Sequence, residues 1–205
     1  TQVVSPLILV DIDNVLFDYD ESLRAWLVEA YPGVGLEIKH RSPVEWERIK
    51  NMYRASGDKQ GGVPIEESIE ALRQFRAEGW SIVLITYRPM KLFSGLEYDT
   101  LWWLAQQRVP YDRIVWAAYE KHIYVREDVA ACDVFVDDDP ITCQLMSALV
   151  SVRVYLVDTT GGLTLERVTT VRDLGEVYAY EQARGTAGTA ALVGDASGGG
   201  IEIRD

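Results

Sequence analysis

The segment 6–17 combines an apolar run with two acidic residues whose spacing suits chemistry. Residues 7–10 are apolar and partly β-branched, which is typical of a central strand covered on both faces. Asp11 and Asp13 follow at i and i+2, so strand alternation would direct both carboxylates to one side. Two carboxylates about 4 Å apart repel by roughly 4 kcal/mol at an effective dielectric near 20. The pair therefore indicates a divalent cation or a retained proton, although an ordinary polar strand end explains it equally well.

Polar side chains also follow other predicted strands, and each alone has an ordinary structural explanation. A lone threonine is most often a strand residue, a lone lysine is usually solvated, and an acidic run before proline can be a turn and helix cap. The carboxyl ends of parallel strands, however, meet at the edge of the sheet where ligands bind. Chance is a poor explanation for so many polar residues at the ends of strands in one sheet. These residues are Asp11, Asp13, Thr86, Lys121, Asp137, Asp138 and Asp139.

This set of side chains suits phosphoryl transfer. One carboxylate can attack phosphorus while a second serves as acid and base. A hydroxyl and an ammonium can hold the phosphate oxygens, and further carboxylates can bind a metal ion. Mg²⁺ fits an all-oxygen site that keeps several waters, so the sequence predicts Mg²⁺ as cofactor and a small phosphorylated molecule as substrate.

The elements that must position these residues alternate between strands and helices. Such alternation implies right-handed crossovers and a parallel sheet. We therefore predict an α/β fold, a Rossmann-like parallel sheet of about five strands with flanking helices and a small inserted helical cap. The predicted strands are 7–10, 81–85, 113–117, 133–136 and 153–157.

One region does not fit this alternation. We predict an α/β core at 1–18 and 64–184, a helical cap at 19–63 and a flexible, Gly/Ala-rich tail at 185–205. Ser42-Pro43-Val44-Glu45 has the pattern of a capping box, and the glycine-rich residues 57–63 are expected to form a flexible return loop. The aromatic residues of the cap could stack on a base, but packing within the cap is the favoured explanation.

Composition limits the classes of function. The formal net charge is −12, which argues against a surface that grips nucleic acid without sequence preference. Cys132 and Cys143 give neither a disulfide framework nor metal-ligand spacing. No apolar run has the length of a membrane span, and we expect a soluble, cytoplasmic protein without a membrane partner. Whether the chain forms a homodimer stays open.

The order Asp-x-Asp, Thr, Lys, Asp-Asp resembles the four motifs of the haloacid dehalogenase-like phosphohydrolases, over roughly residues 6–158. The resemblance implies that Asp11 is the nucleophile, forming an aspartyl-phosphate, and that Asp13 is the general acid and base. It implies phosphate binding by Thr86 and Lys121, although Lys91 competes with Lys121 for this role. It implies Mg²⁺ binding by Asp11, the Asp13 main-chain carbonyl and Asp137 or Asp138.

Two branches of this superfamily look similar to the chain. The 5'(3')-deoxyribonucleotidases share Asp-x-Asp-x-Val-Leu, a cap in this position and an ending of the form Val-Asp-Asp-x-Pro. The phosphatase domain of polynucleotide kinase shares Arg41-Ser-Pro-x-x-Trp46 and an arginine two residues after the threonine, here Arg88. Asn14 and Arg88 join the expected substrate contacts by this resemblance. The chain departs from these patterns at Asn14, where glycine is common, and at Asp139, where the nucleotidases often have arginine.

The resemblance favours a Mg²⁺-dependent phosphomonoesterase, a 5'-nucleotidase acting on nucleoside monophosphates. The alternative is a polynucleotide 3'-phosphatase, which the acidic net charge disfavours. A further alternative is a non-catalytic phospho-accepting or binding module. Receiver modules place the acceptor alone at the third strand and the acid pair at the first, which does not match the order of polar groups here.

Overall fold

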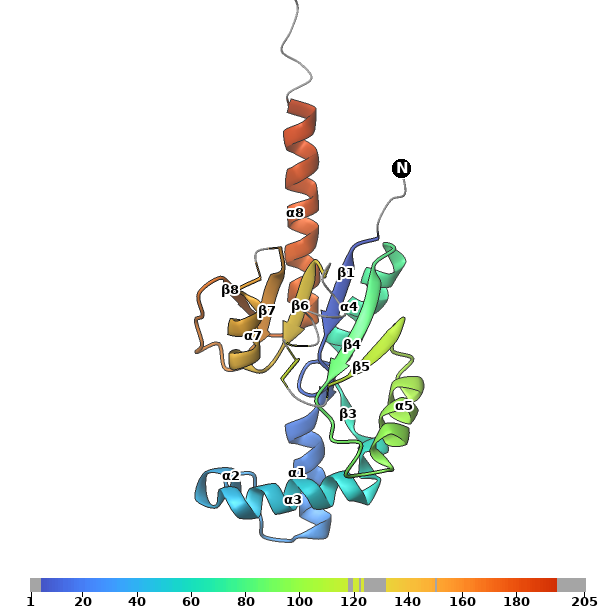
Figure 1. Ribbon diagram of the computed structural model, residues 1–205, viewed down its shortest axis with the longest axis vertical. Coiled ribbons are helices and arrows are strands. Elements are labelled where there is room, and N and C mark those ends of the chain that lie inside the picture. Colours follow the sequence, from blue (N-terminus) through green and yellow to red (C-terminus); the bar gives the residue numbers. More distant parts are fainter. Residues whose placement is uncertain (1–4, 118–119, 122, 124–131, 150, 195–205) are drawn as a thin grey trace, which may run out of the picture.

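The computed structural model describes residues 5–117, 120, 121, 123, 132–149 and 151–194, and six of its strands form one sheet (Figure 1). Every neighbouring pair in this sheet is parallel. The predicted α/β class with a Rossmann-like parallel sheet is therefore confirmed. In spatial order the strands are β5 (Arg113–Trp116), β4 (Ser81–Thr86), β1 (Leu7–Val10), β6 (Val134–Asp137), β7 (Arg153–Val157) and β8 (Val168–Val171).

The sixth strand, β8, is absent from the sequence prediction of about five strands. It pairs with β7 at the edge of the sheet, and only Val171 of its four residues is fully buried. An edge strand that buries one side chain needs no apolar run, so periodicity does not mark it.

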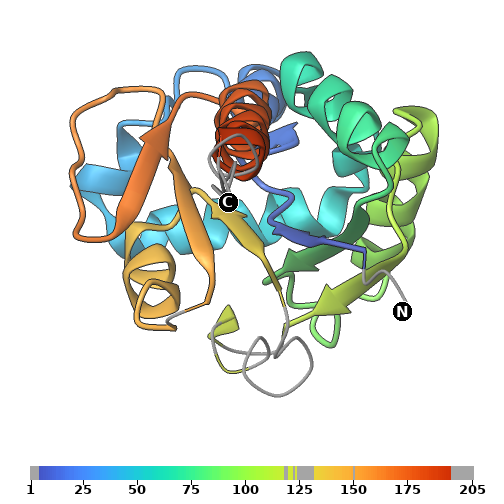
Figure 2. The same ribbon diagram turned by 90° about the horizontal axis from the view of Figure 1, so that it is seen from above.

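Alternate residues of β1 face two different helical layers, which Figure 2 shows from above. Ile8 and Val10 pack with the face covered by α4, α5 and α8, whereas Leu9 packs with the face covered by α7. This burial on both sides explains the uninterrupted apolar run in the sequence. The helices are α4 (Glu66–Ala77), α5 (Leu96–Gln106), α7 (Pro140–Met146) and α8 (Leu174–Gly194).

The cap is inserted between two short strands, β2 (Phe17–Asp18) and β3 (Val63–Pro64), which pair antiparallel. Its helices lie beyond the sheet end toward which the strand arrows point, and α8 extends from the opposite end (Figure 1). The carboxyl ends of the strands thus face the cap. The cap elements are α1 (Tyr19–Ala30), α2 (Ile38–Arg41), α3 (Pro43–Ser56) and the 3₁₀ helix η1 (Asp58–Gly61).

The cap has a small hydrophobic core of its own. Tyr53 is buried and its ring lies 5.4 Å from that of Trp26, and both belong to a cluster that also includes Trp46. The favoured expectation of packing within the cap therefore holds for these rings. Only half of the predicted capping box forms: the backbone N–H of Glu45 donates to the Ser42 hydroxyl at 3.4 Å, but the Ser42 N–H donates to the carbonyl oxygen of Ile38 and the Glu45 carboxylate binds Arg48.

Two segments differ from the prediction. The expected flexible loop at 57–63 instead contains η1 and the first residue of β3. Hydrogen bonds between this segment and α5 hold it in place. The expected flexible tail is helical where it is described, since α8 continues to Gly194, and alanine is a strong helix former. Residues 195–205 lie outside the described part of the chain. Among the described residues, no helix is both long and apolar enough to span a membrane.

Candidate active site

A tight turn after β1 places the first acidic residues at the edge of the sheet. The backbone N–H of Asp11 donates to the carbonyl oxygen of Val136 at 2.9 Å, which keeps Asp11 beside β6. Asn14 has a φ of 58°, a left-handed conformation that asparagine tolerates better than most residues. Its backbone N–H donates to the carbonyl oxygen of Phe17 at 2.7 Å and closes the turn.

Three acidic side chains meet where β1 and β6 end. Carboxylate oxygens of Asp11, Asp137 and Asp138 all lie within 4.8 Å of one another, and we call these residues the carboxylate cluster. Asp11 is 3% exposed and Asp137 is fully buried. The structure thus brings together three of the four residues predicted as metal ligands.

Lys121 is the cation of this cluster. Its ammonium Nζ lies 2.9 Å from Asp137 Oδ2, to which it donates a hydrogen bond, and 2.8 Å from Asp11 Oδ1. The contact to Asp11 is an ion pair without hydrogen-bond geometry, so Oδ1 of Asp11 receives no hydrogen bond from the described residues. The competing candidate, Lys91, is exposed and lines a different cavity. The geometry favours Lys121.

The charges of the cluster do not balance. Burial, only partly offset by Lys121, raises the pKa of Asp11 to about 7 and that of Asp137 to about 6. Burial and then the charge of Asp11 raise the pKa of Asp138 to about 7. Burial alone would lower the pKa of Lys121, but its two carboxylate partners more than offset this and raise it. Three carboxylates around one ammonium are thus an environment that favours added positive charge.

The donor set of the cluster fits a divalent cation. All its ligand atoms are carboxylate oxygens, which Mg²⁺ prefers, and three acids exceed the charge of the one lysine beside them. The residues that would hold the ion are Asp11, Asp137 and Asp138, with the main-chain carbonyl of Asp13 expected from the family resemblance.

Thr86 ends β4 next to the cluster. It is 1% exposed, and its hydroxyl has no hydrogen-bond partner among the described residues. A buried hydroxyl without a partner is costly, and a bound oxyanion would supply one. The hydroxyl is therefore suited to a phosphate oxygen, as predicted for this residue.

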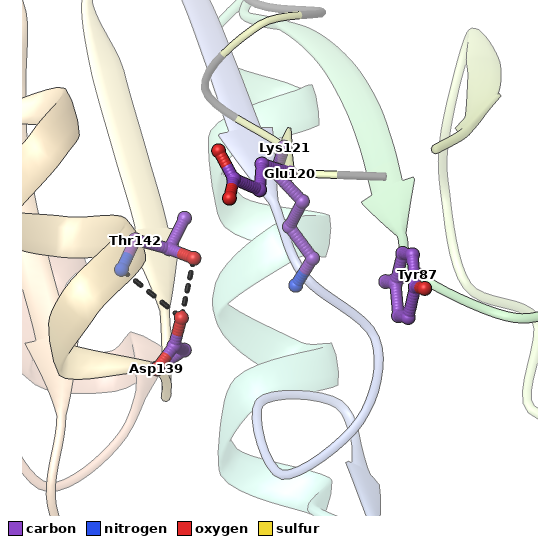
Figure 3. A pocket seen from close by; sticks show the side chains of 5 residues that line it. All are labelled: Tyr87, Glu120, Lys121, Asp139 and Thr142. Carbon is purple, nitrogen blue, oxygen red and sulfur yellow. Dashed lines mark hydrogen bonds between the residues drawn. The ribbon is translucent and has the colours of Figure 1, made fainter. Parts of the chain in front are cut away.

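A cavity of about 410 Å³ opens beside Lys121. Figure 3 shows the Lys121 ammonium between the ring of Tyr87 on one side and Asp139 with Thr142 on the other. Asp139 caps α7, because its carboxylate accepts hydrogen bonds from the backbone N–H groups of Ile141 and Thr142. The sequence left open that the acidic run forms a helix N-cap before Pro140, and Asp139 has this role.

Asp13 lies apart from the carboxylate cluster and is held by two cations, Arg88 and Lys59, which we call the cation clamp. Both carboxylate oxygens of Asp13 accept hydrogen bonds from Arg88, with Nε 3.2 Å from Oδ2. Lys59 Nζ lies 3.5 Å from Oδ1. Burial would raise the pKa of Asp13, but Arg88 and Lys59 outweigh it and hold that pKa well below its usual range.

Asn14 and Arg88, both expected to touch substrate, have their side chains engaged with the protein. Asn14 Nδ2 donates to Asp138 Oδ2 at 2.8 Å, and its Oδ1 accepts from the backbone N–H of Tyr19. Arg88 is 4% exposed and contacts Asp13 and Thr100. In this structure they orient acidic side chains of the site.

Sequence reasoning missed Lys59. The residue sits in the glycine-rich segment assigned to a flexible loop, yet it is 2% exposed. A lysine between Asp58 and Gln60 gives no periodic signal of burial, so only the tertiary structure reveals it.

The sequence matches no protein-family model, and no curated protein matches it. Solved structures do match in shape. One is L-2-haloacid dehalogenase from Xanthobacter autotrophicus, with a TM-score of 0.60 at 10% identity over 87% of this chain and 99% of that chain. Another is a putative haloacid dehalogenase-like hydrolase from Bacteroides fragilis, with a TM-score of 0.57 at 15% identity over 85% and 100%.

The chain has a haloacid dehalogenase-like fold. A third structure of this kind is a D,D-heptose 1,7-bisphosphate phosphatase from B. bronchiseptica complexed with magnesium and phosphate. It matches with a TM-score of 0.52 at 18% identity, over 87% of this chain and 99% of that chain. At such low identities the likeness confirms the fold expected from the sequence motifs.

Proposed function

We propose that this chain is a Mg²⁺-dependent phosphomonoesterase that works through an aspartyl-phosphate intermediate. One observation carries the proposal: the buried carboxylate of Asp11, whose Oδ1 receives no hydrogen bond from the described residues, lies 2.8 Å from the buried ammonium of Lys121. The carboxylate is a nucleophile at a strand end, and the ammonium is placed to stabilise the oxygens of a phosphoryl group beside it.

In the first step, Asp11 attacks phosphorus and the bond from phosphorus to the ester oxygen breaks. The electron pair of that bond goes to the leaving oxygen, which takes a proton from Asp13. Lys121 and the unpaired hydroxyl of Thr86 hold oxygens of the transferred group. When bound by the carboxylate cluster, Mg²⁺ supplies positive charge that offsets the negative charge of the phosphoryl oxygens.

In the second step, water attacks the phosphorus of the aspartyl-phosphate. Asp13 takes the proton of this water, the acyl phosphate bond breaks, and Asp11 and inorganic phosphate are released. The cation clamp favours the ionised form of Asp13, which is the form that this second step requires, whereas the first step requires its protonated form.

The proposed substrate is a nucleoside 5'-monophosphate. The cavity beside Lys121, at about 410 Å³, has a size typical of small-molecule sites. Tyr87 borders it and is 55% exposed, which leaves an aromatic face for a base. The cap carries seven basic and seven acidic residues, so it offers no net positive charge to a polynucleotide.

Phosphate release from a panel of esters tests the proposal. The panel contains nucleoside 5'- and 3'-monophosphates, sugar phosphates and a 3'-phosphorylated oligonucleotide, each with Mg²⁺ and with a chelator. We expect Mg²⁺-dependent release, with the highest kcat/KM for a 5'-mononucleotide and only weak dependence on salt. A preference for the oligonucleotide with a steep loss of activity in salt would support the polynucleotide phosphatase instead. Release from none of the esters would refute the phosphatase function.

A further inference from the structure

Lys59 is a buried cation of the cation clamp that touches none of the reacting atoms in the proposed mechanism. It belongs to η1 of the cap, yet it is 2% exposed and ranks among the largest fully buried side chains. Lysine is almost never buried completely unless it is paired, because removing an ammonium from water is expensive. Such a position calls for a partner.

The surroundings of Lys59 compensate for only part of this cost, since burial and then the charge of Arg88 lower the pKa of Lys59 to about 7 against the opposing effect of Asp13. Its Nζ lies 5.1, 4.5 and 5.6 Å from the ring centroids of Phe17, Tyr19 and Tyr53. Aromatic rings at these distances attract a cation through their quadrupoles. The one carboxylate paired with Lys59 among the described residues is Asp13, with Oδ1 at 3.5 Å. The buried ammonium of Lys59 thus lies between three aromatic rings and the carboxylate of Asp13, the acid and base of the proposed reaction.

The segment that follows Lys59 is anchored to α5 of the core by two hydrogen bonds. Gln60 Nε2 donates to Asp99 Oδ1 of α5 at 2.7 Å, and Trp103 Nε1 donates to the carbonyl oxygen of Gly62 at 2.8 Å. A Cβ at Gly62 would lie 1.9 Å from the ring of Phe17, so only glycine allows this approach. Lys59 is thus held in place relative to α5 and to the turn that bears Asp13.

Without Lys59, Arg88 would be the one side chain among the described residues that forms an ion pair with the carboxylate of Asp13. Its guanidinium binds both oxygens of Asp13 from the end of β4, and the Asp13 side chain is 25% exposed. Lys59 adds a second fixed contact, on Oδ1, from the cap. Two cations on separate elements restrict the rotation of a carboxylate more than one does.

We propose that Lys59 is a positioning residue for Asp13, supplied by the cap, which fixes the carboxylate for proton transfer to the leaving group and from the attacking water. This inference rests on the proposed phosphomonoesterase function and deepens it. It makes the cap a contributor to the acid and base chemistry of the core. Lys59 touches neither the phosphoryl group nor the leaving group in this role.

The test compares Lys59→Met with Lys50→Met. Methionine keeps the length and apolar character of the lysine stem and packs well beside aromatic rings, so the fold should persist. Lys50 lies in the same cap but pairs with Glu47, away from Asp13, which makes it the matched control. Two substrates are used: a nucleoside 5'-monophosphate, whose alkoxide needs a proton to leave, and p-nitrophenyl phosphate, whose phenolate does not.

If Lys59 positions Asp13, Lys59→Met lowers kcat/KM for the mononucleotide by about tenfold or more, a part of what general acid catalysis typically contributes. The loss for p-nitrophenyl phosphate stays below about threefold, since that leaving group needs little acid catalysis. In an Asp13→Asn background the same substitution has no further selective effect. Equal losses for both substrates, or no loss for either, would overturn the positioning role.

A second readout does not depend on activity. The free energy of unfolding is measured in urea for the wild type, Lys59→Met, Asp13→Asn and the double variant, all without substrate. Coupled residues give non-additive effects, and additive effects would overturn the proposed contact. If the wild type releases no phosphate from either ester, the proposed function fails, and this cycle decides whether Lys59 holds Asp13.

Discussion

Asp11 and Asp13 are two residues apart, yet the regions around them have opposite charge. Asp11 belongs to the carboxylate cluster of three acids, two of which, Asp11 and Asp137, pair with the ammonium of Lys121. Asp13 lies in the cation clamp, where Arg88 and Lys59 share one carboxylate. Burial, only partly offset by Lys121, raises the pKa of Asp11 to about 7, whereas the clamp outweighs burial and holds that of Asp13 well below its usual range.

This difference suits two identical side chains to the two different tasks that we propose for them. A cluster with excess negative charge favours an added cation, and a clamp with excess positive charge keeps its acid ionised. Neither environment comes from the Asp-x-Asp segment itself. Lys121 follows β5, Arg88 follows β4 and Lys59 comes from the cap, so three distant parts of the chain separate the roles.

The largest expected effect comes from removing the nucleophile of the carboxylate cluster. Asp11→Asn should reduce phosphate release by about a thousandfold or more, as loss of a covalent nucleophile does in other enzymes. Rapid acid quench followed by mass spectrometry should show the phosphorylated protein in the wild type and not in this variant. The control is Asp133→Asn, at the opposite end of β6, whose carboxylate accepts a hydrogen bond from the N–H of Leu7. Full activity of Asp11→Asn would exclude the covalent mechanism.

Breaking the cation clamp should have the next largest effect. Arg88→Met leaves Asp13 with Lys59 alone and should lower kcat by about a hundredfold, within the range that general acid and base catalysis contributes. Steady-state kinetics with a mononucleotide measures the loss. Arg73→Met is the control, since Arg73 is exposed on α4 and its ion pair is with Glu70. A variant that retains wild-type kcat would show that Asp13 does not need Arg88.

Removing one negative charge from the carboxylate cluster tests whether this region, unlike the cation clamp, binds a cation. Asp138→Asn should lower the affinity for Mg²⁺ by about tenfold or more while leaving the fold intact. Thermal unfolding at increasing Mg²⁺ measures this affinity without substrate, because a ligand bound only by the folded state stabilises it. The wild type should be stabilised by Mg²⁺ at lower concentrations than the variant. An unfolding temperature of the wild type that Mg²⁺ does not change would argue against a metal site.

The carboxylate cluster could be predicted from sequence more fully than the clamp, for a physical reason. Asp11, Thr86 and Asp137 each end a buried apolar strand, so the strand pattern alone brings them to one edge of the sheet. Alternation, however, predicted that Asp11 and Asp13 would share one environment, and the chain instead leaves β1 at Val10 and turns. The position of Lys59 depends on the ring of Phe17 and on the hydrogen bond from Trp103 to Gly62, which no local sequence pattern encodes.

The smallest effect should come from the support of the clamp. Thr100 is fully buried, and its hydroxyl accepts a hydrogen bond from Arg88 Nη1 at 2.6 Å while donating to the carbonyl oxygen of Leu96 at 2.7 Å. Thr100→Val keeps the shape of the side chain but leaves one buried donor of Arg88 without its acceptor. The free energy of unfolding should fall by about 1–3 kcal/mol, the usual cost of such a loss. Thr170→Val, which removes a hydroxyl bonded to the carbonyl oxygen of Leu163 on an exposed part of β8, is the matched control.

The activity of Thr100→Val then decides how the clamp works. Arg88 retains both contacts to Asp13 in this variant, and bidentate pairs are geometrically specific, so kcat should fall by less than about tenfold. The loss should again be larger for a mononucleotide than for p-nitrophenyl phosphate, because it acts through the proton that Asp13 transfers. A variant that is less stable but equally active on both esters would mean that Lys59 and Asp13 fix Arg88 without Thr100. The clamp would then be defined by its two cations and their shared carboxylate alone.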